Sequence, residues 1–240
     1  AADALYQIAK QGKKILFVAT KKQAKEIIAE KAGSVNMPYI TERWAGGMLT
    51  NFSTIRKAVK KMTTIDKMSN DGTFENLSKR EKLQIARQRE KLQKNLGSIS
   101  DLTRLPSALF IVDVNKEHIA VAEAKRLNIP TFAMVDTNCD PDVVDFAIPA
   151  NDDASKSVAL IVDYVCQAIE EGMQERKMDK DSKVAEQEEA ENDRLATELL
   201  DDEVTEGKEE NKIRKVKAVA EDNETKRPRR QVSKKSTSRK

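Results

Sequence analysis

The chain has 240 residues, of which 35% are charged and only 4% are aromatic, and its formal net charge is +3. This length allows one or two ordinary domains, with a core built mainly from aliphatic side chains. No apolar run approaches the roughly 20 residues of a membrane helix and no charged-then-apolar leader opens the chain, so we expect a cytoplasmic protein without a membrane span.

The small net charge hides three regions of different character. Residues 1–178 carry 27 basic and 23 acidic side chains, residues 179–210 carry 4 and 14, and residues 211–240 carry 12 and 3. Blocks of like charge indicate a solvated tail more often than a binding site. We therefore expect residues 174–240 to form a flexible charged tail. The alternative is a general RNA-binding adaptor whose basic end does most of the binding.

Short apolar runs alternate with segments of helical periodicity over most of the first 172 residues. The strand candidates are Ile15–Ala19, Pro38–Ile40, Ala108–Val112, Thr131–Val135 and Phe146–Ile148. The helix candidates are residues 1–10, ended by Gly12, residues 24–33, ended by Gly33, residues 117–127, and residues 154–171, ended by Gly172. Continuous apolar runs are typical of strands buried on both faces. The alternation predicts an α/β fold, with a flavodoxin-like or Rossmann-like parallel sheet flanked by helices.

Residues 53–97 interrupt this alternation with two strongly helical segments. One apolar stripe comprises Ile55, Val59, Met62 and Ile65, and a second comprises Ile85, Leu92 and Leu96. The turn signal Asn70-Asp71-Gly72 separates them. The pattern predicts an antiparallel helical hairpin inserted into an α/β domain of residues 1–52 and 98–173. With 12 basic and 5 acidic side chains, the insertion is markedly basic.

An enzyme is the rival hypothesis, because ligands of parallel sheets bind beyond the carboxyl ends of the strands. Asp113 and Asp136 each follow a predicted strand directly. Their simpler role is to cap the next turn, and neither a Gly-x-Gly-x-x-Gly motif nor a phosphate-binding loop accompanies them. His118 lacks a visible catalytic partner, and Cys139 and Cys166 are too far apart for a zinc motif. We therefore predict no catalytic residue, no metal site and no cofactor.

A second group of residues points to nucleic acid. The segment from Arg43 to Phe52 combines the only Trp with paired glycines, which permit close approach of another backbone. Trp44 could stack on a base or fill the core, and clustered cations on exposed helices suit RNA phosphates or serve solubility alone. The candidate RNA-binding residues are Arg43, Trp44, Asn51, Arg56, Lys57, Lys60, Lys61, Arg80, Arg87 and Arg89.

Three motifs resemble the universal family of bacterial small-subunit ribosomal protein two. The first is Arg43-Trp44-x-Gly46-Gly47-x-Leu49-Thr50-Asn51-Phe52, followed by Thr54-Ile55. The second runs from Leu105-Pro106 through Asp113 to Lys116-Glu117-His118-Ile119-Ala120. The third joins Asn128-Ile129-Pro130 to Val135-Asp136-Thr137-Asn138-Cys139-Asp140-Pro141 and ends with Asn151-Asp152-Asp153-Ala154. The resemblance covers about residues 1 to 172.

This resemblance implies a parallel α/β domain with a protruding hairpin, and a structural rather than catalytic role in translation. It implies binding to small-subunit ribosomal RNA and to neighbouring ribosomal proteins, including the large ribosomal protein one, in a cytoplasmic ribonucleoprotein and not in a homo-oligomer. Family members normally begin with a segment containing a His-Gly-His-like pattern, which does not precede Ala1 here. Ala45 stands where Leu is usual, and Ala150 where Gly is common.

Overall fold

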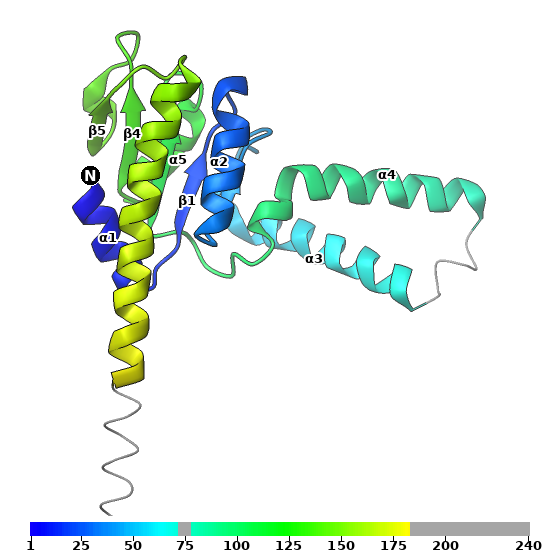
Figure 1. Ribbon diagram of the computed structural model, residues 1–240. Helices are drawn as coiled ribbons and strands as arrows, with labels where there is room; N and C mark the ends of the chain where they lie inside the picture. The colour runs from blue at the N-terminus through cyan, green and yellow to red at the C-terminus, as the bar shows by residue number, and fades with distance from the viewer. Residues whose placement is uncertain (72–77, 183–240) are drawn as a thin grey trace, which may run out of the picture. The chain divides into compact units, whose positions relative to one another are not determined.

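The computed structural model of this chain describes residues 1–71 and 78–182. Within these residues, five parallel strands form one sheet in the order β2-β1-β3-β4-β5 (Figure 1). The strands are β1 (Ile15–Val18), β2 (Tyr39–Ile40), β3 (Ala108–Val112), β4 (Thr131–Val135) and β5 (Phe146–Pro149). Each predicted strand is confirmed to within a residue, and so is the parallel α/β fold class.

A row of aromatic rings crosses the sheet from edge to edge. The strand register aligns five rings, in the order Tyr39, Phe17, Phe110, Phe132 and Phe146. The ring centroids of Phe17 and Phe110 lie 5.2 Å apart, and those of Phe132 and Phe146 lie 4.4 Å apart in a stack. Such pairs add about 0.5–1.5 kcal/mol each beyond the area they bury. The two ring pairs therefore favour the observed register of β1 with β3 and of β4 with β5.

Helices cover both faces of the sheet. The face that carries the aromatic row packs against α1 (Ala2–Lys10), α2 (Lys22–Ser34) and a helix over residues 155–182. The opposite face packs against α5 (His118–Arg126) and the loop of residues 44–49. Both faces of the central strands are consequently buried, which explains why their sequences are continuous apolar runs.

The predicted hairpin helices are α3 (Phe52–Asn70) and α4 (Lys79–Leu96), which lie side by side (Figure 1). Met62 and Ile65 are buried on α3, and Leu96 is buried where α4 meets the short helix η2 (Gly97–Ile99). A capping box of Ser78 and Glu81 begins α4, which satisfies amide groups that would otherwise lack partners. The base of the hairpin packs on the same apolar cluster as α5.

The helix over residues 155–182 corrects the prediction that Gly172 ends it and that a tail begins at residue 174. A Cβ atom on Gly172 would lie only 2.6 Å from the carbonyl oxygen of Tyr6 and 3.2 Å from Cβ of Ala9. The glycine thus permits close packing on α1 rather than a helix end. Beyond it, Glu175 accepts hydrogen bonds from Tyr6 and Lys10.

Left-handed backbone appears where short loops leave the helices. Gly12, the second residue after α1, has φ +71°, as predicted for a helix-ending glycine. The prediction that Gly33 ends the second helix is wrong, because α2 continues to Ser34. Asn36, and not the glycine, takes the left-handed conformation, at φ 52°. Asn128 plays the same part after α5. Asparagine tolerates this conformation better than most residues.

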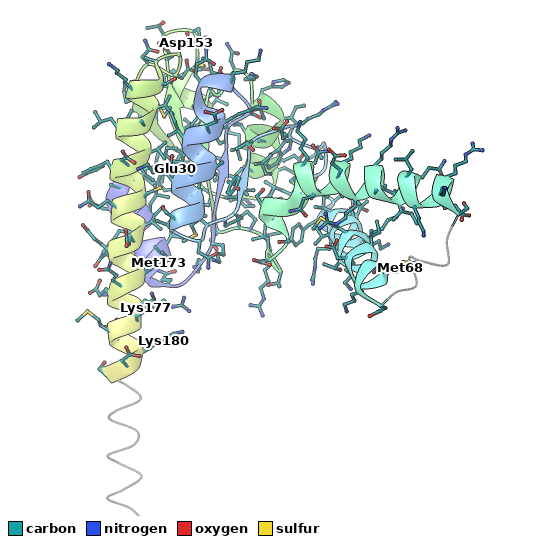
Figure 2. The ribbon with its side chains drawn as sticks, turned by 45° about the vertical axis from the view of Figure 1, so that its right-hand side comes forward. Glu30, Met68, Asp153, Met173, Lys177 and Lys180 are labelled. Atoms are coloured by element: carbon teal, nitrogen blue, oxygen red, sulfur yellow. The ribbon has the colours of Figure 1, made fainter. Side chains whose placement is uncertain are left out.

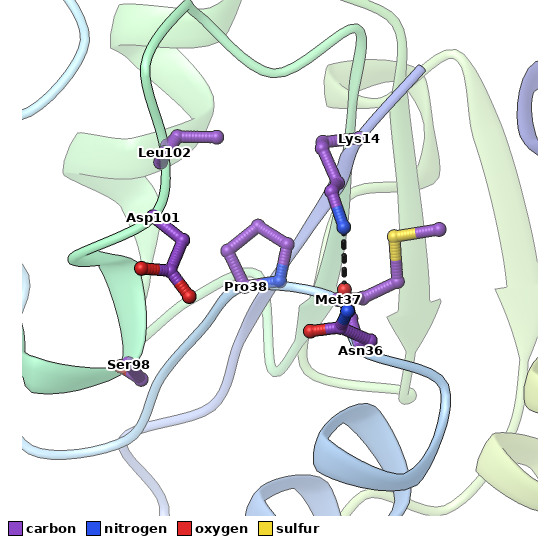
Figure 3. A pocket seen from close by; sticks show the side chains of 7 residues that line it. All are labelled: Lys14, Asn36, Met37, Pro38, Ser98, Asp101 and Leu102. Atoms are coloured by element: carbon purple, nitrogen blue, oxygen red, sulfur yellow. Dashed lines mark hydrogen bonds between the residues drawn. The ribbon is translucent and has the colours of Figure 1, made fainter. Parts of the chain in front are cut away.

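A small hollow lies where the amino ends of β1 and β2 meet the base of the hairpin (Figure 3). Lys14 Nζ donates a hydrogen bond of 2.6 Å to the carbonyl oxygen of Asn36 there. Nearby, the Ser98 hydroxyl donates to the carbonyl oxygen of Tyr39. The hollow holds about 50 Å³, well below the roughly 300–1,000 Å³ of small-molecule sites. We therefore assign it to packing.

Some expectations fall outside the described residues. They concern Gly72 of the predicted turn and the tail beyond residue 182, including its separately charged blocks. Ala1–Lys180 form one compact unit, and Asp181–Lys240 form a second, of which only residues 181 and 182 are described. No helix in the described part is long and apolar enough to cross a membrane.

The close contact at Gly172 can be tested with Gly172→Ala. Alanine is favoured over glycine in a helix by about 1 kcal/mol, but overpacking against α1 costs about 1–3 kcal/mol. We expect urea unfolding to show a net loss of up to about 2 kcal/mol in the free energy of unfolding. Gly33→Ala is the matched control, since no heavy atom lies within 4 Å of its new Cβ. Equal stabilisation by both substitutions would contradict the close packing.

Candidate nucleic-acid interface

The first half of α3 carries four exposed cations, Arg56, Lys57, Lys60 and Lys61. Residues four apart are neighbours on a helix, so these side chains form two adjacent rows, 56 with 60 and 57 with 61. Within the described residues, none of the four takes part in an ion pair. Side chains project into solvent along both helices of the hairpin (Figure 2). This part of α3 therefore presents positive charge that its surroundings do not cancel.

The cations of α4 differ from one another. Arg80 and Arg87 are exposed, as the sequence suggested. Arg89 forms an ion pair with Asp66 of α3, which links the two helices across the seam. Lys94 Nζ lies 3.7 Å from the carboxylate of Glu42, beside the sheet. Part of the predicted RNA-binding charge thus has a structural role within the protein.

A buried carboxylate fixes the loop that leads into α3. Glu123 of α5 is 8% exposed and accepts five hydrogen bonds from the loop. The donors are the Trp44 indole (3.1 Å), the amides of Gly47 (2.7 Å), Leu49 (2.9 Å) and Thr50 (3.1 Å), and the Thr50 hydroxyl (3.2 Å). A carboxylate can accept about four such bonds without strain, so its bonding capacity is full. The loop is held by one side chain.

These bonds also set the charge state of Glu123. Burial alone would raise its pKa, because it disfavours the charged form. The amides of Thr50 and Leu49 and the indole of Trp44 outweigh burial and lower the pKa from its ordinary value. The group is therefore ionised at neutral pH, and its negative charge is balanced by hydrogen-bond donors rather than by a cation.

Three of the predicted RNA-binding residues, Arg43, Trp44 and Asn51, lie in the loop before α3 and differ in exposure and bonding. Trp44 is 6% exposed within the apolar cluster, which leaves no ring face for a base, so it is withdrawn as an RNA contact. Asn51 is exposed at the start of α3, and its side-chain oxygen accepts the hydroxyls of Ser53 and Thr54. Arg43 is exposed and stays a candidate.

The carboxyl edge of the sheet contains a cluster of opposite charges. Lys21, after β1, places its Nζ 3.4 Å from Asp113, 2.8 Å from Asp152 and 2.6 Å from Asp153. Burial opposes its charge, but bonds to Asp152 and Asp153 outweigh burial and raise its pKa. In the strand order observed, β1 and β3 flank the switch point where doubly wound folds bind ligands. Here a lysine occupies that crevice.

The two aspartates of the enzyme hypothesis serve the backbone. Asp113 accepts the amide of Lys116, and Asp136 accepts those of Thr137 and Asp152. The amide of Thr137 is the main cause that lowers the pKa of Asp136. These are the capping roles that the sequence allowed as the simpler interpretation.

Other groups that could carry chemistry are also bound to the protein. His118 Nδ1 lies 3.1 Å from the carbonyl oxygen of Asn115. Buried Glu117 accepts the amide and hydroxyl of Thr20. Burial raises the pKa of the Cys166 thiol to about 11, the opposite of what a nucleophile needs.

Three carboxylates at this edge, of Asp136, Asp152 and Asp153, offer oxygens within 4.8 Å of one another. One oxygen of buried Asp152 has no hydrogen-bond partner, and burial is the main cause that raises its pKa. The Lys21 ammonium already stands beside two members of the group, at the distances of an ion pair. The single ammonium of Lys21 thus offsets only part of the negative charge of these carboxylates.

Sequence reasoning missed Glu123 and Lys21, which organise these two regions. Glu123 falls on the buried side of α5 with Ala120 and Ala124. A carboxylate within an apolar helical stripe is a signal that could have found it, since buried charges need partners. Lys21 gave no comparable signal, because lysine after a strand is ordinary on a surface.

Comparison with known proteins assigns the family. A family model described as Ribosomal protein S2 matches residues 1–172. The chain belongs to the ribosomal protein S2 family. It is 74% identical over 180 residues to small ribosomal subunit protein uS2 of Phocaeicola vulgatus. The corresponding proteins of Parabacteroides distasonis and Christiangramia forsetii are 66% identical over 196 residues and 64% identical over 195 residues.

The matches cover more of this chain than of its relatives. They span 75%, 82% and 79% of the S2-family chain, but 64%, 70% and 65% of the Phocaeicola, Parabacteroides and Christiangramia proteins. The chain thus spans less than two thirds of the length of two of these three relatives. Residues 1–172, which the family model matches, include the sheet, the hairpin and the loop held by Glu123.

The role of Glu123 in this S2-family chain can be tested with Glu123→Gln. The amide group brings two N–H donors toward a loop that already supplies donors, so buried bonds are lost. We expect the free energy of unfolding to fall by roughly 2–4 kcal/mol, measured by urea unfolding at pH 7. Glu26→Gln, on the exposed side of α2, should change it by less than about 0.5 kcal/mol.

The same variant gives a pH signature with a defined sign. Because the folded-state pKa of Glu123 is lowered, its stabilisation is present above the ordinary glutamate value of about 4.3. It is lost as the pH falls through the lowered pKa. The stability difference between the native and Glu123→Gln chains should therefore shrink in acid. A difference that is constant from pH 7 down to the acid transition would contradict this assignment.

Proposed function

We propose that this chain is a structural constituent of the small ribosomal subunit and binds ribosomal RNA through its helical hairpin. The observation that carries the proposal is the two adjacent rows of exposed cations on α3, Arg56 with Lys60 and Lys57 with Lys61, none of which forms an ion pair within the described residues. The relatives named above are small ribosomal subunit proteins, which supports the same conclusion.

The proposed mechanism is electrostatic and geometric. Each basic side chain that approaches a phosphate releases condensed counterions, which favours binding and makes it dependent on salt. Phosphate contacts of this kind fix position and orientation without reading sequence. Two packed helices present the charges at fixed spacing, and the loop held by Glu123 joins them to the sheet. Arg56, Lys57, Lys60 and Lys61 are the main contacts we propose, with Arg43, Arg80 and Arg87 as further ones.

The α/β body would serve neighbouring proteins. At the carboxyl edge of its sheet one cation, Lys21, faces three aspartates, so this edge offers less attraction to phosphates than the hairpin does. We propose that the α/β body contacts other small-subunit proteins, including the large ribosomal protein one, on ribosomes in the cytoplasm. A structural rather than catalytic role fits the aspartates, which bind backbone amides.

Replacing Arg56, Lys57, Lys60 and Lys61 with Ala tests the proposal. Small subunits of Phocaeicola vulgatus, depleted of their own S2-family protein, provide the binding partner, and affinity is measured between about 50 and 200 mM salt. Each lost phosphate contact should reduce the slope of log affinity on log salt by about 0.7–0.9. We expect a weaker complex and a slope shallower by about 3 if all four residues contact phosphates.

The control variant removes the same charge elsewhere, at the exposed residues Lys13, Lys22, Lys125 and Lys156. It should keep most of the native slope. Similar slopes for both variants would show that net charge, not the hairpin, drives binding. A chain without residues 211–240 tests the alternative of an RNA-binding adaptor whose basic end does most of the binding. Complete loss of affinity in this shortened chain would contradict an interface centred on the hairpin.

A further inference from the structure

A second hollow runs along α3 beside the segment that returns from α4 to the sheet. It holds about 160 Å³. It is lined by Phe52, Ile55, Arg56, Val59, Lys60, Thr63, Ile99, Ser100, Leu102 and Thr103. We call this hollow the α3 groove. It lies on the row of α3 that carries Arg56 and Lys60.

The floor of the α3 groove is apolar and part of the folded core. Ile99 is 3% exposed, and half-buried Ile55, Val59 and Leu102 pack against the same cluster. These residues come from both chain segments that join the hairpin to the body. Because the core holds them, the floor exists before any partner binds. Binding to this preformed floor would therefore cost little side-chain entropy.

The rim of the α3 groove is polar and positive. Arg56 and Lys60 stand one helical turn apart at its edge, and no carboxylate lines it. Thr63, Ser100 and Thr103 add three hydroxyl groups. Two of these already donate within the protein, Thr63 to the carbonyl oxygen of Lys60 and Ser100 to Asp101. Their oxygens can still accept a hydrogen bond.

We propose that the α3 groove binds one unpaired nucleotide of ribosomal RNA. The base would lie on the apolar floor, and the adjoining phosphates would contact Arg56 and Lys60. This inference rests on the proposed function and deepens it, because it adds one base-binding site to a surface that otherwise contacts only the RNA backbone.

The chemistry of the groove favours this occupant. Its volume is below the roughly 300–1,000 Å³ of small-molecule sites, which suits a single flat ring system better than a cofactor. RNA is commonly recognised through unpaired bases that leave the stack and rest on protein side chains while cations hold the backbone. An apolar side chain of a neighbouring protein would fill the floor but would leave Arg56 and Lys60 without anionic partners.

Filling the groove without changing charge tests the proposal. Thr63→Phe places a ring over the floor. Thr64→Phe is the matched control, because Thr64 is also exposed on α3 and also donates to the carbonyl oxygen of Lys60, but does not line the groove. Thr103→Phe, from the opposite wall, gives a second blocked chain. Thermal unfolding identifies any variant that fails to fold.

The readouts are affinity for the depleted Phocaeicola vulgatus subunits and base-specific chemical probing of their RNA. We expect Thr63→Phe or Thr103→Phe to weaken binding by roughly 5- to 150-fold, the scale of one base contact. One unpaired base should be protected by the native and Thr64→Phe chains but not by the blocked chains. The salt slope should stay near native, because the cations remain.

Two results would overturn the proposal. Equal affinity and identical base protection for the Thr63→Phe and Thr64→Phe chains would show that no base enters the groove, and would leave it to a neighbouring protein. Failure of the hairpin to contribute to the salt slope would instead contradict the proposed function itself. The four-alanine variant measures that separately, so the two failures are distinguishable.

Discussion

The arrangement of this protein depends on the carboxylate of Glu123. It accepts hydrogen bonds from the indole of Trp44 and from three amides of the loop that follows. That loop leads directly into α3. The hairpin is thereby joined to α5 and the sheet through hydrogen bonds to a buried charge, which are stronger than neutral ones. Because one side chain holds so many donors, its loss would release the whole entrance to the hairpin.

Charged side chains have different surroundings in the α/β body and in the helical hairpin. In the α/β body, Lys21 faces three aspartates and buried Glu117 faces Thr20, so the crevice that often binds ligands is closed by internal pairing. On α3 the exposed cations Arg56, Lys57, Lys60 and Lys61 take part in no ion pair within the described structure. The same fold therefore suppresses the usual ligand site and offers its uncancelled charge on an inserted element, where a polyanion can reach it.

The pattern of apolar residues was sufficient to predict the strands and the hairpin, because buried strands are continuous apolar runs and the hairpin helices carry apolar residues at helical spacing. The predicted helix end at Gly172 was wrong, since a glycine that permits close packing on α1 looks the same in sequence as one that ends a helix. The sequence allowed Trp44 to stack on a base or to fill the core. Its burial in the apolar cluster decides between these roles, together with its bond to Glu123, 79 residues away. The α3 groove is likewise formed by segments distant in sequence.

The most direct measurement is an electron cryomicroscopy map of small subunits of Phocaeicola vulgatus reconstituted with this chain. We predict that Arg56, Lys57, Lys60 and Lys61 lie within hydrogen-bond reach of RNA phosphates, with the loop around Glu123 unchanged from the structure described above. A map in which α3 faces solvent, or in which RNA contacts only the α/β body, would contradict the account.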